Sequence, residues 1–340
     1  MSAKVSFIVA VYNVSDYIER CAQSLFEQTL EDIEIIFCDD ASTDNSVQLI
    51  RDLLNRYPRR RECVKFICNE TNQGTAINRW NGAKAATGEY VLLVDGDDYL
   101  EVTMGEELYS EAVSSGADVV QCDCYYDSAD EIVRKRTSIQ GEDLRDCLLN
   151  RIAWHNIWIR LFKRSLLDND QLVWPKCHMA DDLVISIAVT ALASKAVYLP
   201  IPLYHYNYNP NSIMSCRNEA GLLSMYEQQL VNTDVLVDFW RKQGLQEKYE
   251  MGYVITMSHA RNILLDITNK RKYRRLWRRT YPELNKLIFW GNKNHPSSYR
   301  NKIWYVAVLL GLFPSCQRYL LSKYLSPSDE WQVRMPRKRG

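Results

Sequence analysis

Apolar residues form strand-like runs at four places in the first hundred positions. The first run, VSFIVAV, is unbroken, which is typical of a strand covered on both faces. Three shorter runs rich in β-branched and aromatic residues follow it, each bounded by polar or turn-forming residues. The predicted strands are 5–11, 34–38, 64–68 and 90–94.

Between these strands the apolar residues change to helical spacing. Positions 18–26 and 47–54 follow the i, i+3, i+4 rule, and a third helix is expected over about 75–86. Ser15 precedes the first helix and is expected to cap it. Strands that alternate with amphipathic helices predict an α/β fold with a mostly parallel, doubly wound sheet.

Acidic residues follow two of the predicted strands directly. Asp39 and Asp40 end the second strand, and Asp95, Asp97 and Asp98 end the fourth in the sequence YVLLVDGDDYL. Ligands of doubly wound sheets bind at the carboxyl ends of strands. Neighbouring carboxylates repel each other, so a bound cation explains this clustering better than packing does. Two carboxylates on one side of a strand end could hold Mg²⁺ or Mn²⁺.

Glycine-rich phosphate loops are missing from the expected places. The first strand continues into VYNVSDY, which is not GxGxxG, and the chain has no GxxxxGK[ST] sequence. Phosphate groups are therefore not expected on a glycine loop. The acids could neutralise them only through a metal ion.

Charge divides the chain of 340 residues into two regions. Through residue 258 there are 24 Lys and Arg against 38 Asp and Glu, and from residue 259 there are 18 against 4. Such asymmetry suggests different partners for the two regions. We expect one domain over about 1–215 and a mainly helical basic tail over 216–340.

The tail contains the sequence KRKYRRLWRR, residues 270–279, with Tyr273 and Trp277 at helical spacing. A basic amphipathic helix of this kind is typical of elements on anionic membrane surfaces. The apolar run 303–313 is shorter than the ~20 residues of a spanning helix, but it could lie in the headgroup region. Trp277, Trp304 and Phe313 would then add an apolar contribution to lipid binding. The alternatives are a solvated helix face, a core helix, or an acceptor-binding region. Nucleic acid is not expected, because the first region is acidic.

Ten cysteines are scattered along the chain, and its start, MSAKVSFIVAVYN, does not resemble a signal peptide. We therefore expect reduced thiols in a cytoplasmic protein, which the tail could hold on the inner face of the cell membrane. Cys122 and Cys124 form a single CxC pair, for which a structural place in a strand is favoured over zinc.

Five stretches, in order along the chain, resemble the inverting family 2 glycosyltransferases with the GT-A fold. They are VSFIVAVYNVSDYIERCAQSLFEQTLEDIEIIFCDDASTDNS, NQGTAINRWNGAKAATGEYVLLVDGDD, RLFKRSLLDND, ADDLVISI and PLYHYNYNPNSIM. They extend from Val5 to Met214. The resemblance implies a nucleotide-sugar donor, most simply a UDP-sugar, and a divalent metal.

The resemblance also implies roles in donor binding. Backbone from Ala10 to Tyr12 would border the nucleotide base, and Asp40 would accept a hydrogen bond from the uracil imide. The alternative for Asp40 is an acid at the N-terminus of the next helix. Arg79 would lie near the base or the diphosphate, or would be a surface arginine.

The fourth strand end has roles of its own in the resemblance. Asp95 would face the ribose and Asp97 would bind the metal. The chain departs from the family in the preceding helix. The usual Arg-Asn pair is Arg79-Trp80 here, with Asn81 one place late.

The base that removes the acceptor proton would be Asp182, by alignment with the family. Asp181 and Asp182 open a predicted helix, whose N-terminus stabilises negative charge, and nearby acids would raise the pKa of Asp182. The alternative is that both aspartates only cap the helix.

Aromatic residues and histidines before this helix suggest an acceptor site. Trp154, His155 and Trp158 could contact the acceptor together with Asp181, although both tryptophans could equally belong to the core. His155, His178 and His205 lack the spacing of metal ligands, so structural roles are favoured.

The predicted function is the transfer of a sugar, with inversion, to a glycan or lipid-linked glycan in cell-surface polysaccharide synthesis. One alternative is a nucleotidyltransferase, which would want a glycine- and arginine-rich loop after the first strand. Another is a catalytically inactive sugar-nucleotide-binding or scaffold protein, against which the presence of both Asp97 and Asp182 argues.

Overall fold

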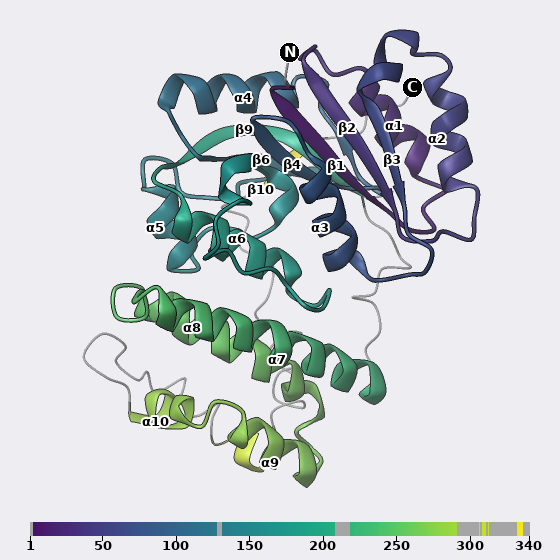
Figure 1. The fold of residues 1–340 in the computed structure, drawn as a ribbon. Coiled ribbons are helices and arrows are strands. Elements are labelled where there is room, and N and C mark those ends of the chain that lie inside the picture. The colour runs from purple at the N-terminus through teal and green to yellow at the C-terminus, as the bar shows by residue number, and fades with distance from the viewer. Residues whose placement is uncertain are drawn as a thin grey trace. The chain divides into compact units, whose positions relative to one another are not determined.

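The computed structural model describes residues 3–127, 131–207, 218–290, 306, 308–310, 312 and 332–335. The chain divides into two compact units (Figure 1). Unit 1 comprises Met1–Pro210 with Trp331–Gly340, and unit 2 comprises Asn211–Glu330. Unit 1 carries the strand-end acids, and unit 2 carries the basic helix.

The four strands predicted in the first hundred residues are confirmed and lie next to one another. They run parallel in the order β3-β2-β1-β4. Ala10 of β1 is in register with both Cys38 of β2 and Asp95 of β4, so these strand ends meet at one edge. The strands are β1 (Val5–Val11), β2 (Ile33–Asp39), β3 (Val64–Cys68) and β4 (Tyr90–Asp95).

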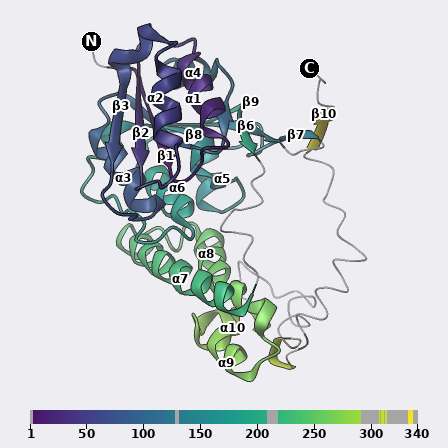
Figure 2. The same ribbon diagram turned by 90° about the vertical axis from the view of Figure 1, so that its right-hand side faces the viewer.

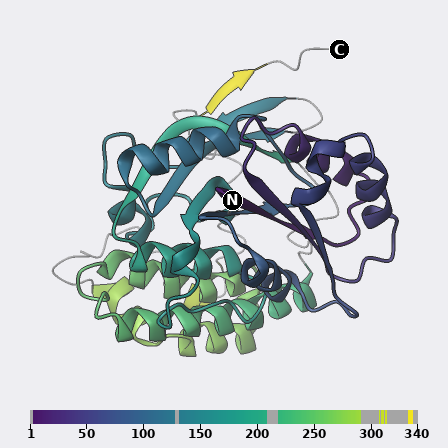
Figure 3. The same ribbon diagram turned by 45° about the horizontal axis from the view of Figure 1, so that its top comes forward.

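Beyond β4 the sheet is mixed rather than parallel. β8 pairs antiparallel with both β4 and β6, whereas β6 and β9 are parallel to each other. Figures 2 and 3 show β10 at the edge of the sheet, where it pairs with β7. These strands are β5 (Tyr99–Leu100), β6 (Val119–Asp127), β7 (Ile132–Lys135), β8 (Arg160–Lys163), β9 (Ala196–Asn207) and β10 (Gln332–Met335).

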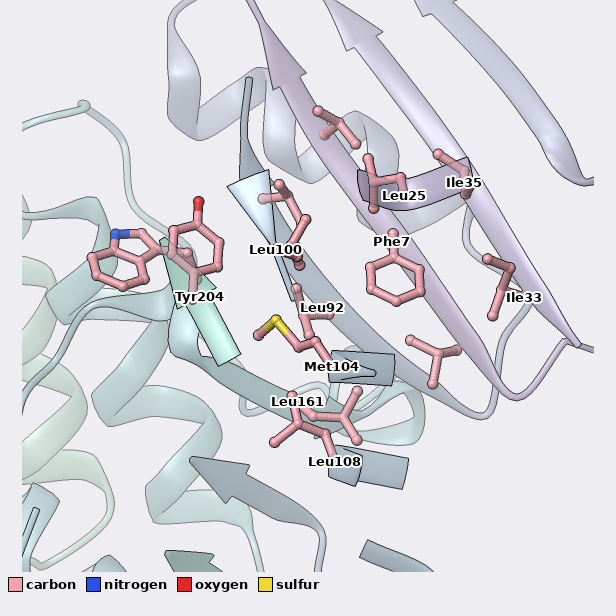
Figure 4. Packing of buried hydrophobic residues seen from close by; sticks show 14 of the residues in the cluster. Phe7, Leu25, Ile33, Ile35, Leu92, Leu100, Met104, Leu108, Leu161 and Tyr204 are labelled. Atoms are coloured by element: carbon pink, nitrogen blue, oxygen red, sulfur yellow. The ribbon is translucent and has the colours of Figure 1, made fainter. Parts of the chain in front are cut away.

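Helices cover both faces of the parallel strands because the side chains of each strand alternate between two cores. Phe7 and Val9 face one core, with α1, α2 and α4, and Ile8 faces the other, with α3, α5 and α6. Figure 4 shows Phe7, Leu25, Leu92 and Met104 in the first core. The helices are α1 (Ile18–Phe26), α2 (Ser46–Leu54), α3 (Thr75–Ala85), α4 (Met104–Ser115), α5 (Leu144–Leu149) and α6 (Asp181–Leu192), with short 3₁₀ helices at η1 (Pro58–Cys63), η2 (Ile157–Ile159) and η3 (Arg164–Leu166).

The predicted N-cap at Ser15 is wrong. A turn at residues 15–17 precedes α1, which begins at Ile18. The N–H of Ser15 donates to Asp44 at 2.9 Å, and the N–H of Asn13 donates to the Ser42 hydroxyl at 3.0 Å. The polar residues after β1 therefore fasten this loop to the loop before α2 instead of capping a helix.

Gly82 brings α3 unusually close to the sheet. A Cβ atom at this position would collide with the side chains of Ile8 and Cys38. The contact requires glycine, and it seats the whole helix against β1 and β2. Arg79 lies one turn earlier on α3, so this packing sets how far its side chain reaches.

Unit 2 is helical and has its own core. Its elements are α7 (Glu219–Lys242), α8 (Glu250–Asn262), η5 (Ile263–Ile267), α9 (Arg271–Arg279) and α10 (Glu283–Trp290). α7 and α8 lie side by side (Figure 1). Tyr273 and Trp277 of α9 are buried among Leu222, Tyr226 and Leu264. The aromatic side of the basic helix therefore faces protein, and the prediction that Trp277 contacts lipid is wrong.

Most of the apolar run 303–313, including Trp304 and Phe313, lies outside the described residues, as do the last seven residues of the stretch ending at Met214. Within the described ranges, no helix combines the length and apolarity needed to span a bilayer. Cys122 and Cys124 are on β6, as expected for structural residues, and both are buried in the first core. Burial raises the pKa of both thiols.

Candidate active site

Three aspartates meet one buried arginine at the carboxyl edge of the sheet. Arg79 is 4% exposed. Its Nη2 lies 2.5 Å from Asp95 Oδ1, and its Nη1 lies 2.8 Å from Asp181 Oδ2 and 2.7 Å from Asp182 Oδ1. The sequence analysis singled out all four residues, but it did not predict that they bind one another.

Each aspartate of the cluster sits at the end of an element. Asp95 ends β4, and Asp181 and Asp182 open α6, as predicted. Ala180, just before them, has a left-handed backbone with φ of 63°, which costs a non-glycine residue ~1–2 kcal/mol. Such strain persists only where surrounding contacts fix it, and here it directs two successive aspartates toward Arg79.

Burial and charge act against each other in the cluster. Burial disfavours the Arg79 cation, but the three carboxylates outweigh it and raise its pKa. Burial also raises the pKa of Asp181, to about 7, against the opposing effect of Arg79. The pKa of Asp182 is raised by burial too, and the nearby charge of Asp95 adds to this. One cation does not balance three carboxylates, and this imbalance favours the protonated form of Asp181.

Asp182 is the more accessible of the two helix-opening acids. Its side chain is 25% exposed, compared with 11% for Asp181. Asp181 Oδ1 accepts the backbone N–H of Asp182 at 2.9 Å. Arg79 contacts Asp182 Oδ1, and among the described residues Asp182 Oδ2 has a single long contact of 3.4 Å with the N–H of Ile157. This oxygen is therefore the one best placed to take a proton from a ligand.

Asp97 lies in a turn and not on the strand. The N–H of Asp98 donates to the Asp95 carbonyl at 3.1 Å, closing a turn directly after β4. The argument that Asp95 and Asp97 point the same way as strand neighbours is therefore wrong. Asp98 is buried, and it accepts the Tyr204 hydroxyl at 2.7 Å and the Asn207 N–H at 2.8 Å. Burial, with Asp97 and Asp95 nearby, raises its pKa.

The carboxylates of this turn supply only some of the oxygen ligands that a metal ion needs. Among the described residues, no three His, Cys, Asp or Glu side chains are grouped to hold an ion. Asp97 is half-buried, Asp95 is bound to Arg79, and Asp98 points into the protein. Mg²⁺ commonly binds one or two carboxylates together with substrate phosphates and water. The turn therefore fits an ion that binds with a diphosphate.

Asp40 organises a loop beside the edge of the sheet. Its Oδ1 accepts Asn69 Nδ2 and the Gln73 N–H, each at 2.8 Å, and its Oδ2 accepts the Gly74 N–H at 2.8 Å. It makes no bond to α2, so the helix-terminus alternative is not supported. A carboxylate has about four acceptor sites. Oδ2 therefore retains one for a ligand N–H, although Asp40 is only 3% exposed.

The remaining candidates for binding the nucleotide-sugar donor lie along the same edge of the sheet. Ala10 accepts the Gly96 N–H at 3.0 Å, and Tyr12 is 47% exposed after β1. Trp80, where the family has asparagine, packs on Trp174 with ring centroids 4.7 Å apart. Asn81 donates to Asn69 Oδ1 at 3.3 Å and so supports the loop that Asp40 holds.

The acceptor candidates separate into core and rim. Trp158 is 2% exposed and stacks on Tyr204 at 4.4 Å, which makes it a core residue. Trp154 and His155 are half-buried, and His155 Nδ1 lies 3.0 Å from the Ser186 hydroxyl of α6.

The other two histidines have different surroundings. His205 lies between the rings of Tyr99 and Tyr125, 4.1 and 4.7 Å away, as expected for a structural residue. His178 is half-buried, and burial lowers its pKa.

Several residues around the site had no predicted role. Asn69 holds Asp40, and Tyr204 and Asn207 hold Asp98. Arg160 is fully buried beside Gln121, and burial lowers its pKa to about 9. The alternating aromatic residues of PLYHYNYN were a usable signal for Tyr204, since alternate positions of a strand share a face.

Sequence comparison links the chain to one family of known proteins. The model of the family described as "Glycosyl transferase family 2" matches residues 6–182. The chain is 33% identical over 220 residues to the glycosyltransferase EpsJ of Bacillus subtilis, covering 62% of each chain. It is 28% identical over 246 residues to the glycosyltransferase YibD of Escherichia coli, covering 69% of this chain and 70% of YibD.

Solved structures share the architecture at low sequence identity. TarS 1–349 of S. aureus, in complex with UDP-GlcNAc, has a TM-score of 0.58 at 17% identity, over 93% of this chain and 92% of TarS 1–349. The mannosyltransferase PcManGT of Pyrobaculum calidifontis, in complex with GDP-Man and Mn²⁺, has a TM-score of 0.53 at 15% identity, over 95% of this chain and 88% of PcManGT. The family match covers more than half of the chain, and the fold is that of these GT-A enzymes: the protein belongs to glycosyltransferase family 2.

Proposed function

We propose that this protein is an inverting glycosyltransferase that moves a sugar from a UDP-sugar to a hydroxyl of a glycan or lipid-linked glycan. The observation that carries the proposal is the meeting of Arg79 with Asp95, Asp181 and Asp182 at the carboxyl edge of the sheet. The guanidinium of Arg79 joins Asp95, a candidate for binding the sugar donor, to Asp182, the candidate general base.

Asp182 is proposed as the general base. A sugar hydroxyl attacks weakly until its proton is removed, and a carboxylate with a raised pKa removes it more readily. Asp182 Oδ2 accepts the proton while Arg79 holds Oδ1 in place. The hydroxyl then attacks the anomeric carbon from the face opposite the leaving nucleotide, so a single displacement inverts the configuration.

Donor binding is proposed at the ends of β1, β2 and β4. Asp40 Oδ2 would accept the imide N–H of uracil, Tyr12 and the Ala10 backbone would border the base, and Asp95 would face the ribose. Asp97 would hold Mg²⁺ or Mn²⁺, which neutralises charge on the diphosphate when bound. Support for a nucleotide-sugar donor comes from the UDP-GlcNAc and GDP-Man complexes of the structural relatives.

Cell-surface polysaccharide synthesis is the proposed setting. One relative is the poly(ribitol-phosphate) beta-glucosyltransferase of Bacillus spizizenii, 31% identical over 196 residues. The chain spans only 62% of the length of EpsJ. The activity and partners of these relatives are therefore proposed for this chain and not assigned to it.

A nucleotide-release screen tests the proposed function. The full chain would be incubated with UDP-glucose, UDP-galactose, UDP-GlcNAc and GDP-mannose, with Mg²⁺ or Mn²⁺, and free nucleotide would be measured. Release from at least one donor, lost in Asp182→Asn, is expected when an acceptor glycan is present. Absence of nucleotide release from every donor would favour the catalytically inactive binding or scaffold protein.

Substituting Asp97 tests the metal. Asp97→Asn is expected to abolish transfer and to remove the effect of Mn²⁺ on UDP affinity, because an amide is a poorer ligand for a hard cation. Calorimetric titration of UDP with and without EDTA would measure this. Asp168→Asn, at an exposed carboxyl in the same unit, is the control. Normal turnover of Asp97→Asn in EDTA would contradict metal dependence.

The outward side of α9 is proposed to bind anionic lipid on the inner face of the cytoplasmic membrane. Arg271, Arg275, Arg278 and Arg279 are exposed, and the aromatic side of the helix is buried. The attraction would therefore be electrostatic, about 1 kcal/mol for each basic residue near the surface.

Vesicle sedimentation would measure this attraction. Replacing these four arginines with Gln should weaken binding to vesicles containing phosphatidylserine at low salt by at least about tenfold. Arg274 stays, because it donates to the carbonyls of Thr268 and Asn269. The matched control replaces four exposed arginines of unit 1 with Gln, at positions 51, 56, 59 and 61. Equal loss in both variants would contradict a specific role of α9.

A further inference from the structure

We propose that Tyr126, Trp154 and Tyr206 line the acceptor subsite, where the ring of Trp154 stacks on the C–H face of a pyranose. The inference rests on the proposed function and names the chemical class that the acceptor must present. All three side chains are half-buried at the rim of the first core. The wall that they form is called the aromatic rim below.

The aromatic rim is tied by backbone to both parts of the candidate active site. Tyr206 precedes Asn207, whose side chain donates to the Asp97 carbonyl at 3.2 Å and whose N–H donates to Asp98 at 2.8 Å. On the other side, Trp154 lies three residues before Ile157, whose N–H contacts Asp182 Oδ2 at 3.4 Å. The rim therefore lies between the turn after β4 and the candidate base.

The rings are held by one another and by the core. Tyr126 lies 4.9 Å from Tyr206 and 5.8 Å from Trp154, measured between ring centroids. Trp158 stacks on Tyr206 at 5.7 Å from behind. The Trp154 carbonyl accepts the buried Arg160 guanidinium at 2.8 Å, which fixes the backbone of this segment. A pre-arranged wall of this kind loses little conformational freedom when a ligand binds.

A pyranose fits this wall better than the nucleotide base does. Asp40, the proposed contact of the nucleotide base, follows β2. Tyr126 is on β6, and β4 and β8 lie between β1 and β6 in the sheet. The donor and the aromatic rim are thus on opposite sides of the acid cluster. Pyranoses present C–H bonds on one face and hydroxyls at the edge, and aromatic rings with polar tips suit that combination.

A second aromatic group on β6 and β9 supplies the matched control. Tyr125 and His205 alternate with Tyr126 and Tyr206 along paired strands, so they point to the opposite face. His205 is enclosed between Tyr125 and Tyr99, and Arg20 covers the Tyr99 ring at 3.3 Å. Tyr125 therefore supplies an aromatic ring on the same pair of strands but on the face away from Trp154.

Saturation-transfer NMR on the full chain with UDP tests the inference. The probes are methyl β-D-glucopyranoside, methyl β-D-galactopyranoside and methyl N-acetyl-β-D-glucosaminide, and sorbitol is the control that has hydroxyls but no ring face. Saturation of the ring protons of at least one pyranoside, and not of sorbitol, is expected. Trp154→Ala should weaken that pyranoside about three- to tenfold, the value of one aromatic stacking contact. Tyr125→Leu should not weaken it.

The possible failures are distinguishable. If wild-type protein binds neither UDP nor the other donors, the proposed function fails. If UDP binds but no pyranoside gives a signal, or if Trp154→Ala and Tyr125→Leu behave alike, the aromatic rim is not the acceptor subsite. Tyr126→Leu repeats the test at a second position should Trp154→Ala prove unfolded by circular dichroism.

Discussion

Replacing Asp182 with Asn is expected to lower kcat by about 10²–10⁴-fold, the usual contribution of a general base. The amide has nearly the same shape and can still accept from Arg79 through its oxygen, but it cannot take a proton. UDP affinity should change little, because Asp182 is proposed to act on the acceptor. Steady-state kinetics and calorimetric titration of UDP would separate these two effects.

The control for this substitution is Asp168→Asn, whose carboxyl is exposed and pairs only with Arg164 on the surface. It should keep normal kinetics. If Asp182→Asn lost UDP binding as strongly as turnover, the residue would be structural, and the helix-capping alternative would return.

The rate of the wild-type enzyme should also depend on pH in the way that a general base requires. A base works only when ionised, and burial raises the pKa of both Asp181 and Asp182. The rate should therefore begin to fall well above pH 4, the range in which an ordinary aspartate takes up its proton. A rate that stays constant down to pH 5 would contradict a base in this cluster.

Replacing Arg79 with Met is expected to lower the free energy of unfolding by about 3–5 kcal/mol and to abolish transfer. Removing one partner of a buried ion pair leaves charge uncompensated, and that is the costly part. Here three carboxylates would lose their common cation. Urea unfolding followed by circular dichroism would measure the loss, with Arg59→Met, at an exposed arginine, as the control.

Arg79→Lys separates charge from geometry. An ammonium keeps the cation, but it cannot reach Asp95 and the Asp181-Asp182 pair with two fixed nitrogens. The variant should recover part of the stability and little of the kcat. Full activity in Arg79→Lys would mean that charge alone matters. A stability equal to wild type in Arg79→Met would mean that the cluster is solvated and not buried.

Local pattern was sufficient to predict the parallel half of the sheet. VSFIVAV is an unbroken apolar run of strand length, the helix after it has one strong helical period, and the neighbouring elements agree with them. The antiparallel strand β8 was not predicted, because its four residues Arg160–Lys163 are too short to show a period. Its place between β4 and β6 depends on pairing partners far along the chain.

The candidate site was predicted as residues but not as a geometry. Strand-end and helix-start positions identified Asp95 and Asp182. The turn that moves Asp97 off the strand depends on a hydrogen bond from Asp98, which strand periodicity does not contain. Trp277 was predicted to contact lipid, but it is buried in protein. Helical spacing identifies the apolar side of a helix and does not show whether protein or lipid covers that side.

The Arg79 cluster also bears on how the chain is made. Its acids come from residues 95 and 181–182, so a nascent chain that has reached the end of β4 can supply Arg79 with Asp95 alone. The strands β1 to β4 pair among themselves and can assemble early, whereas closing the long loop to α6 carries an entropic cost and comes later. Synthesis would thus complete the proposed nucleotide-binding half before the proposed base exists, and an unfinished chain would lack the group that activates the acceptor.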